Sequence, residues 1–98
     1  MIANYRLIST AMEEVAETIA HYNEVGVGVS RAFMRDLDRA IDILRVFPLT
    51  GVSVDNGFRS FPLHQYPFTI IYKVENDELI IMAVAHQSRR PEYWRDRM

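Results

Sequence analysis

The sequence predicts an α+β fold in the order β-α-α-β-β-β, with a helical hairpin packed on one face of a small, mainly antiparallel sheet. Residues 10–46 repeat apolar side chains at helical spacing and are interrupted only around Gly26 and Gly28. Residues 58–86 hold three short runs of strand-forming residues, separated by turn-forming sequences. A further strand-like run at residues 3–8 precedes the helices, so strands flank the hairpin on both sides.

Length and composition limit the class of protein. The 98 residues suffice for one core, and we expect residues 1–98 to form a single domain. No apolar run approaches the roughly 20 residues that cross a bilayer, and the first residues lack the pattern of a signal peptide. We therefore expect a cytoplasmic protein without a membrane partner. Cysteine is absent and the three histidines are scattered, so we expect no disulfide, no metal and no cofactor.

Positive charge is concentrated near the C-terminal end. The formal net charge of −2 and a pI near 5.9 argue against binding nucleic acid through bulk electrostatics. Yet the last ten residues hold four arginines against only Glu92 and Asp96. They follow an apolar run that ends at His86, and groups just beyond a strand end are held in defined positions. The segment 86–97 is therefore the first candidate for a functional site.

The first helix is expected to run from Thr10 to about Asn23. Thr10 and Glu13 have the spacing of a capping box, in which each side chain bonds the other residue's amide. The predicted buried stripe consists of apolar side chains at helical spacing, namely Met12, Val15, Ala16, Ile19 and Tyr22. Glutamates fall largely on the other side, which predicts an acidic outer face.

The second helix is expected from about Val29 to Val46, and Pro48 ends it. Its predicted buried side consists of Phe33, Leu37, Ala40, Ile41 and Leu44. The short glycine turn between the helices favours an antiparallel hairpin. An i, i+4 row of arginines lies on the polar side, at Arg31, Arg35 and Arg39, near Asp38 and Asp42. We interpret this row as a solvated, salt-bridged helix face.

Three strands are predicted after a loop at residues 48–57. They cover residues 58–63, 68–74 and 79–86, and the links between them are short enough for hairpins. The strand 79–86 is apolar on both faces and is expected to be central, whereas Pro62 lacks an amide donor and suits an edge. Where the first strand joins the sheet stays open.

Several motifs occur in a characteristic order along the chain. They are Pro48 after the second helix, FRSFPL at 58–63, YPFTIIY at 66–72, and VAH at 84–86 followed by RRPEYW at 89–94. Together they resemble the RelE/ParE toxin superfamily of bacterial type II toxin–antitoxin systems, some of which serve plasmid stabilization. The resemblance implies a growth-inhibiting toxin that a cognate antitoxin neutralises, in a toxin–antitoxin hetero-oligomer.

The superfamily implies two different activities. RelE-like members cut mRNA in the ribosome, whereas ParE-like members poison DNA gyrase without known hydrolytic chemistry. Arg59, Arg89 and Tyr93 match the functional arginines and tyrosine of the nucleases, and His86 could carry protons with Tyr93. The lysines that nuclease relatives carry before and on the second strand are absent here, since residues 52–57 read VSVDNG.

The missing lysines and the acidic charge balance favour the ParE-like reading, in which Arg59, Arg89, Arg90 and Tyr93 bind the target. The alternative is an endoribonuclease that uses Arg59, His86, Arg89 and Tyr93 as catalytic residues. A further alternative is a degenerate, non-toxic binding module. DNA gyrase is thus the favoured target, and the ribosome with its mRNA is the other candidate.

Each candidate residue also has a purely structural interpretation. His86 could be a neutral histidine bonded to backbone, and Arg59 either an ion-pair member or an anion contact. Arg89 and Arg90 could simply complement Glu92 or Asp96. Trp94 is expected to pack back onto the sheet as an anchor. The resemblance adds that an antitoxin helix would lie on the helix hairpin.

Overall fold

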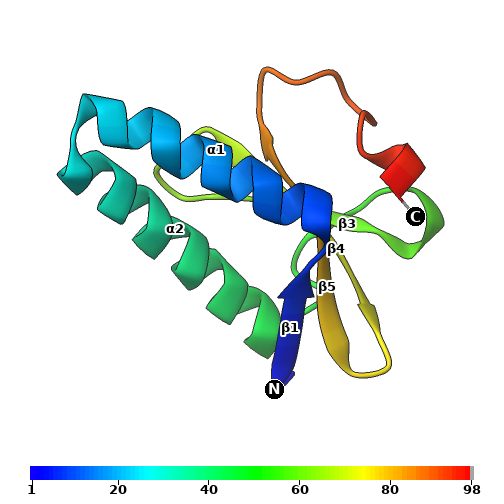
Figure 1. Ribbon diagram of the computed structural model, residues 1–98. Helices are drawn as coiled ribbons and strands as arrows, with labels where there is room; N and C mark the ends of the chain where they lie inside the picture. The colour runs from blue at the N-terminus through cyan, green and yellow to red at the C-terminus, as the bar shows by residue number, and fades with distance from the viewer. Residues whose placement is uncertain (98) are drawn as a thin grey trace.

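Two helices lie side by side against one face of a five-stranded mixed sheet in the computed structural model, which describes residues 1–97 (Figure 1). The sequence-based fold class is confirmed. The elements are, in chain order, β1 (Asn4–Leu7), α1 (Ser9–Val25), α2 (Val27–Val46), β2 (Val52–Ser53), β3 (Arg59–Pro62), β4 (Phe68–Glu75) and β5 (Glu78–His86). Short 3₁₀ turns cover Asp55–Gly57 and Arg95–Arg97. No helix in residues 1–97 is long and apolar enough to cross a membrane.

The sheet has the order β1-β5-β4-β3-β2. β1 runs parallel to β5, which places the first strand, and all other neighbours are antiparallel. The expectation that β5 is an interior strand is confirmed. β3 was expected at an edge, but the two-residue strand β2, read from the sequence as loop, pairs with Arg59 and Ser60. Pro62 lies beyond that pairing, where no partner needs its missing amide.

The predicted capping box of α1 is wrong. The helix begins at Ser9, one residue before Thr10, and its N-cap Ile8 has no side-chain cap hydrogen bond. The Ile8 amide bonds the Ile81 carbonyl of β5 at 3.1 Å. The N-cap residue is therefore still paired with the sheet, and the helix follows the strand directly. The predicted stripe is also partly wrong, because Met12 and Ala16 are exposed. Ala11 is buried, and Val15, Ile19 and Tyr22 pack on the core.

The predicted buried face of α2 is confirmed: Phe33, Leu37, Ala40, Ile41 and Leu44 are all buried. The predicted salt bridges on its polar face are wrong. Within the described residues, Arg31, Arg35 and Arg39 make no ion pair, and the nearby Asp42 pairs with Arg45 instead, at 3.5 Å. These three guanidinium groups therefore remain available to a partner.

The β4–β5 hairpin forms the centre of the sheet. Asn76 and Asp77 form its two-residue turn with φ angles of 54° and 58°, the left-handed values that a type I′ turn requires. Ile71 pairs with Ala83 and Tyr72 with Ile81, so Met82 is an extra residue that forms a β-bulge. The bulge turns both Met82 and Ala83 towards the face opposite the helices.

The two faces of the sheet carry separate clusters of buried side chains. The larger cluster lies between the helices and the sheet and includes Phe33, Leu44 and Tyr72. The smaller cluster lies on the other face and consists of Ile71, Ile80, Met82, Ala83 and Trp94. Trp94 is only 6% exposed and meets Phe58 at a ring-centroid distance of 5.1 Å, which confirms it as an anchor. The C-terminal segment thus covers the second face of the sheet.

Candidate functional site

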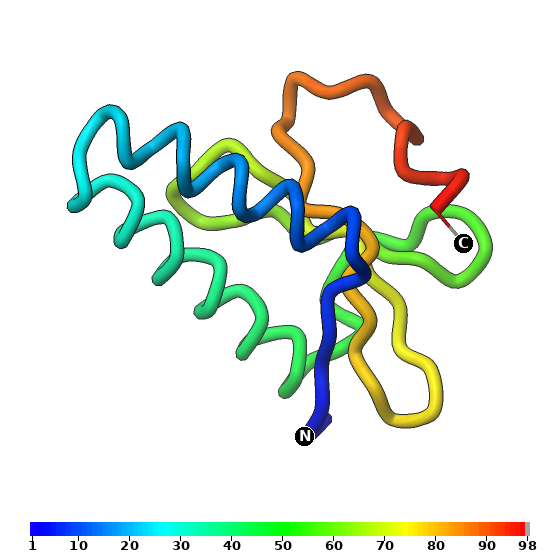
Figure 2. The backbone as a smooth tube through the Cα atoms, in the orientation of Figure 1, coloured from blue at the N-terminus to red at the C-terminus, as the bar shows by residue number. Residues whose placement is uncertain are grey.

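The end of β5 opens into an arch that leaves the sheet and returns to it at Trp94 (Figure 2). Four sequence-predicted residues, His86, Arg89, Arg90 and Tyr93, line one cavity of about 190 Å³ beneath this arch. Arg59 does not line it. The geometry therefore brings together most of the predicted set and separates Arg59 of β3 from it.

His86 is exposed, and its ring contacts Ser88 and Phe68. Its Nδ1 accepts the Ser88 amide hydrogen bond at 3.0 Å and lies 2.7 Å from the Ser88 hydroxyl oxygen. Phe68 meets the imidazole at a centroid distance of 5.1 Å in an edge-on arrangement. Because Nδ1 accepts an N–H donor, the neutral tautomer that fits this contact carries its proton on Nε2.

Arg89 and Arg90 are both exposed on the arch. The Arg89 guanidinium carbon lies 3.9 Å from the centre of the Tyr93 ring, a stacked cation–π contact. Neither arginine forms an ion pair within residues 1–97; Glu92 and Asp55 instead pair with Arg95. The two cations closest to His86 are therefore not neutralised by the neighbouring carboxylates.

Tyr93 is held by a carboxylate from α1. Its hydroxyl donates to Glu14, and the two terminal nitrogens of Arg97 each donate to the same carboxylate at 2.9 Å. Burial and the hydrogen bond to Glu14 raise the pKa of Tyr93 well above its usual range. Burial alone would raise the pKa of Glu14, but hydrogen bonds from Arg97, Tyr93 and the Val84 amide outweigh it and lower that pKa.

Arg59 is bound to backbone. One terminal nitrogen donates to the carbonyl oxygens of Leu49 and Gly51, at 3.2 and 2.8 Å. It forms no ion pair within residues 1–97 and ties the loop after α2 to β3, while the anion contact expected from the sequence stays a prediction. The Tyr72 hydroxyl supports the same loop by accepting the Gly51 amide and donating to the Pro48 carbonyl.

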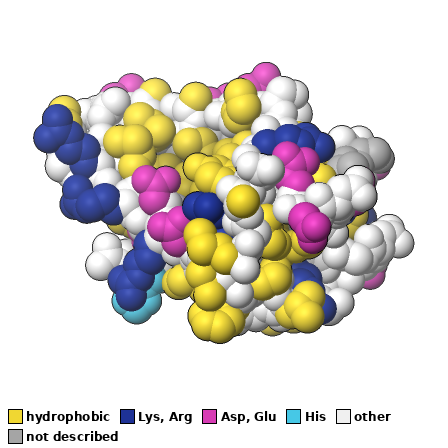
Figure 3. All heavy atoms as spheres, turned by 90° about the horizontal axis from the view of Figure 1, so that it is seen from below, with side chains coloured by type: hydrophobic (Ala, Val, Ile, Leu, Met, Phe, Trp, Pro, Cys, Tyr) yellow, Lys and Arg dark blue, Asp and Glu magenta, His cyan; other side chains and the backbone are white. Residues whose placement is uncertain are grey.

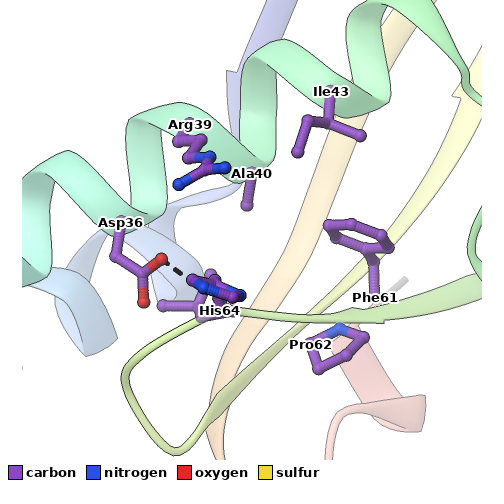
Figure 4. A pocket seen from close by; sticks show the side chains of 8 residues that line it. Asp36, Arg39, Ala40, Ile43, Phe61, Pro62 and His64 are labelled. Carbon is purple, nitrogen blue, oxygen red and sulfur yellow. Dashed lines mark hydrogen bonds between the residues drawn. The ribbon is translucent and has the colours of Figure 1, made fainter.

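A second candidate surface lies on α2. A groove of about 310 Å³ runs between α2 and β3, and Figure 4 shows Arg39 and Ile43 of the helix opposite Phe61 and Pro62 of the strand. Asp36 closes one end, where its carboxylate accepts the backbone amides of His64, Gln65 and Tyr66 at 2.8–3.2 Å.

The groove continues along α2 into an exposed apolar surface. A neighbouring hollow of about 550 Å³ is lined from Arg35 to Phe47. Phe47 at its end and Leu49 just after it are 64% and 72% exposed. On the face seen in Figure 3, several basic side chains lie at one end, and hydrophobic side chains with a few acidic ones occupy the middle. Exposed apolar clusters of this kind mark interaction sites.

Sequence reasoning did not find Glu14, Arg97 and Asp36 as organising residues. Glu14 was counted with the other glutamates on the predicted acidic outer face of the first helix. The missed signal was its position: Glu14 lies one turn from Ala11 and next to Val15, on the face that packs inward. The described residues hold no cluster of three metal-ligating side chains.

Comparisons with known proteins agree with this architecture. A comparison with curated protein sequences found no significant match. Among solved structures, a chain of the chromosomal ParDE TA system from P. aeruginosa superimposes with a TM-score of 0.74 at 17% sequence identity, covering 87% of this chain and 96% of that one. The family described as ParE toxin of type II toxin-antitoxin system, parDE, matches residues 5–91. That match begins in β1 and runs through β5 into the arch that carries Arg89 and Arg90, so the chain belongs to the ParE toxin family of type II toxin–antitoxin systems.

Proposed function

We propose that this protein arrests growth by binding DNA gyrase through the arch after β5, and that a cognate antitoxin neutralises it in a hetero-oligomer. The contact surface consists of His86, Arg89 and Arg90, which are exposed at and just beyond the end of β5. We place the protein in the cytoplasm, where both partners would be met. It acts by binding and needs no cofactor.

The main observation against RNA cleavage is that the Tyr93 hydroxyl is already hydrogen-bonded to Glu14. RNA cleavage needs a group that takes the 2′-OH proton and another that protonates the leaving oxygen. The Tyr93 hydroxyl is bound to Glu14 and its pKa is raised, so it is a poor base and its proton is already shared. Arg59 is similarly occupied by the Leu49 and Gly51 carbonyls. These contacts support a structural role for two of the four nuclease candidates.

One observation favours the nuclease alternative. His86 has an exposed ring, and Arg89 lies nearby on the same cavity. A histidine with a nearby arginine can supply a proton carrier and one phosphate clamp. His86 and Arg89 alone lack the second proton-transfer group that RNA cleavage needs. We therefore prefer gyrase binding.

Induced expression of the chain, followed by two assays, tests the proposal. Purified gyrase should lose supercoiling activity or accumulate cleaved plasmid when the protein is added, and the cells should show double-strand DNA breaks. Primer extension on cellular mRNA should show no new in-frame cuts. In-frame cuts with normal supercoiling would establish the nuclease instead, and absence of growth arrest together with tight antitoxin binding would establish the degenerate module.

The antitoxin is proposed to bind the groove and apolar surface along α2. Arg31, Arg35 and Arg39 make no ion pair within the described residues, so a segment with carboxylates opposite them and apolar side chains opposite Ile43 and Phe47 is complementary. The span from Arg35 to Val46 corresponds to roughly 16 Å of helix axis. This length suits about three turns of a bound helix.

Pro62 favours a helix over a strand as the bound segment. The Leu63 amide bonds the Phe68 carbonyl at 2.9 Å, so alternation along β3 directs the nitrogen of Pro62 away from β4. That free part of β3 consequently offers no amide donor to an added strand. A helix lying in the groove needs none.

A further inference from the structure

Glu14 is the one glutamate of α1 that is not exposed; Glu13, Glu17 and Glu24 all face solvent. Its carboxylate accepts hydrogen bonds from the Val84 amide, the Tyr93 hydroxyl and both terminal nitrogens of Arg97. These donors belong to β5 and to the C-terminal segment. A single side chain therefore joins the first helix, the central sheet and the segment that returns from the arch.

The location of this cluster follows from the length of β1. β1 pairs with β5 only as far as Ile81, because the chain then turns into α1. The Met82 carbonyl and the Val84 amide would otherwise lack partners on that side of β5. Arg97 donates to the Met82 carbonyl at 3.0 Å and Glu14 accepts from the Val84 amide at 3.0 Å. The ion pair thus completes the hydrogen bonding where the neighbouring strand ends.

The same cluster determines where Arg89 lies. Hydrogen bonding to Glu14 fixes the Tyr93 ring, and the Arg89 guanidinium stacks on that ring at 3.9 Å. Arg97 also lies over the ring, at 4.8 Å. No carboxylate within residues 1–97 pairs with Arg89, so the aromatic face is its main support. A cation presented in this way is preorganised for a partner.

We propose that Glu14 is a positioning residue for the target-binding arch after β5: it holds residues 88–97 against the sheet and, through Tyr93, sets the orientation of Arg89. Glu14 contacts no target itself. This inference rests on the proposed function only in its last step, the use of Arg89 against gyrase. When the Glu14 contacts are lost, the C-terminal segment should detach while the helices and strands remain folded.

The fluorescence of Trp94 reports whether residues 88–97 stay packed on the sheet. Trp94 is the only tryptophan in the chain, lies in that segment and is buried. Glu14→Gln keeps the size of the side chain but removes its charge. We expect a red-shifted emission and stronger acrylamide quenching of Trp94, with an unchanged far-UV CD spectrum. Glu17→Gln, an exposed neighbour on the same helix, should leave both signals as in the wild type.

The link to Arg89 is tested by a double-mutant cycle in the gyrase supercoiling assay. Glu14→Gln and Arg89→Ala should each weaken inhibition, by on the order of tenfold for Arg89→Ala. The loss in the double variant should be smaller than the sum of the two single losses, since part of the effect of Glu14 passes through the arginine. A purely structural role for Glu14 would instead give additive losses, and that result overturns the proposal.

Tyr93→Phe makes the test independent of whether Glu14→Gln folds. It keeps the ring that packs under Arg89 and removes only the hydroxyl that Glu14 holds, so the same quenching change in weaker form is expected. Unchanged Trp94 quenching in this variant contradicts the positioning role of Glu14. If wild-type protein does not inhibit gyrase, the proposed target is wrong, and the Trp94 signals still decide whether Glu14 holds the segment.

Discussion

Glu14 makes stability depend on pH at the scale of a single residue. Its pKa in the folded protein is lowered below the ordinary 4.5. The stabilisation is therefore fully present above pH 4.5 and is lost as the pH falls through the lower folded value. Glu14→Gln should remove this acid dependence and lower the free energy of unfolding near neutral pH by about 2 kcal/mol. Urea unfolding at several pH values between neutrality and strong acid measures both effects.

The matched control is Glu75→Gln. The pKa of Glu75 is also lowered, by its hydrogen bond to Lys73, but the Glu75 carboxylate is exposed and the change should have little effect. Tyr93 makes stability depend on pH in the alkaline range. Its pKa is raised above 10.0, so its stabilisation is present below pH 10.0 and is lost as the pH rises further. If the free energy of unfolding of Glu14→Gln falls at low pH as it does in the wild type, carboxylates other than Glu14 cause the acid dependence.

Gly51 is the glycine at which a side chain cannot be accommodated. A Cβ there would lie 2.5 Å from the Tyr72 hydroxyl oxygen and 2.9 Å from the Ser60 carbonyl oxygen, and Tyr72 is fully buried. We expect Gly51→Ala to lower the free energy of unfolding by about 3 kcal/mol. Gly28→Ala is the counterpart: nothing lies within 4 Å and the site is helical, so a gain of about 0.5–1 kcal/mol is expected. Thermal unfolding of both variants checks the opposite signs.

Asp36 acts at the scale of elements, since it joins α2 to the loop between β3 and β4. Its two carboxylate oxygens accept three backbone amides, from His64, Gln65 and Tyr66. Asp36→Asn replaces one acceptor oxygen by a donor and leaves amides unpaired, which should cost about 2 kcal/mol. Hydrogen exchange should accelerate at those three amides, while the exposed Asp38→Asn leaves them protected. Equal protection in both variants would contradict this role.

The sequence predicted elements better than the contacts between them. Apolar spacing identified the buried face of α2, and Asn76-Asp77 identified a hairpin, because these signals are local. The bulge at Met82 and the two-residue strand β2 depend on how strands pair in the folded sheet, which no local pattern records. Glu14 illustrates the limit most clearly: its partners Tyr93 and Arg97 lie 79 and 83 residues away.

The same limit explains how the candidate site changed between sequence and structure. His86, Arg89 and Arg90 were found because a strand end carries them, and they are indeed exposed there. Tyr93 was found as a residue type, but its role depends on a carboxylate that only the tertiary fold supplies. Arg59 was expected beside a charge and is bonded to carbonyls of a loop that the sequence left unstructured.

At the scale of the whole molecule, the two proposed binding surfaces lie apart. α2 carries the arginine row and the groove, the arch carries Arg89 and Arg90, and α1 lies between them in the view of Figure 1. With a net charge of −2, each cluster is a local positive patch and not part of a general field. Contacts to the antitoxin and to the target should therefore respond to different substitutions.

A pair of charge-matched double variants tests this separation. Arg35→Glu with Arg39→Glu should weaken binding of the co-encoded antitoxin by on the order of a hundredfold, because two complementary charge contacts become repulsive, while gyrase inhibition persists. Arg89→Glu with Arg90→Glu should abolish inhibition and leave antitoxin affinity unchanged. Both variants alter net charge by the same amount, so a bulk electrostatic effect would change both assays alike. Isothermal titration with antitoxin and the supercoiling assay give the two readings, and loss of both activities in either variant would mean that one surface serves both partners.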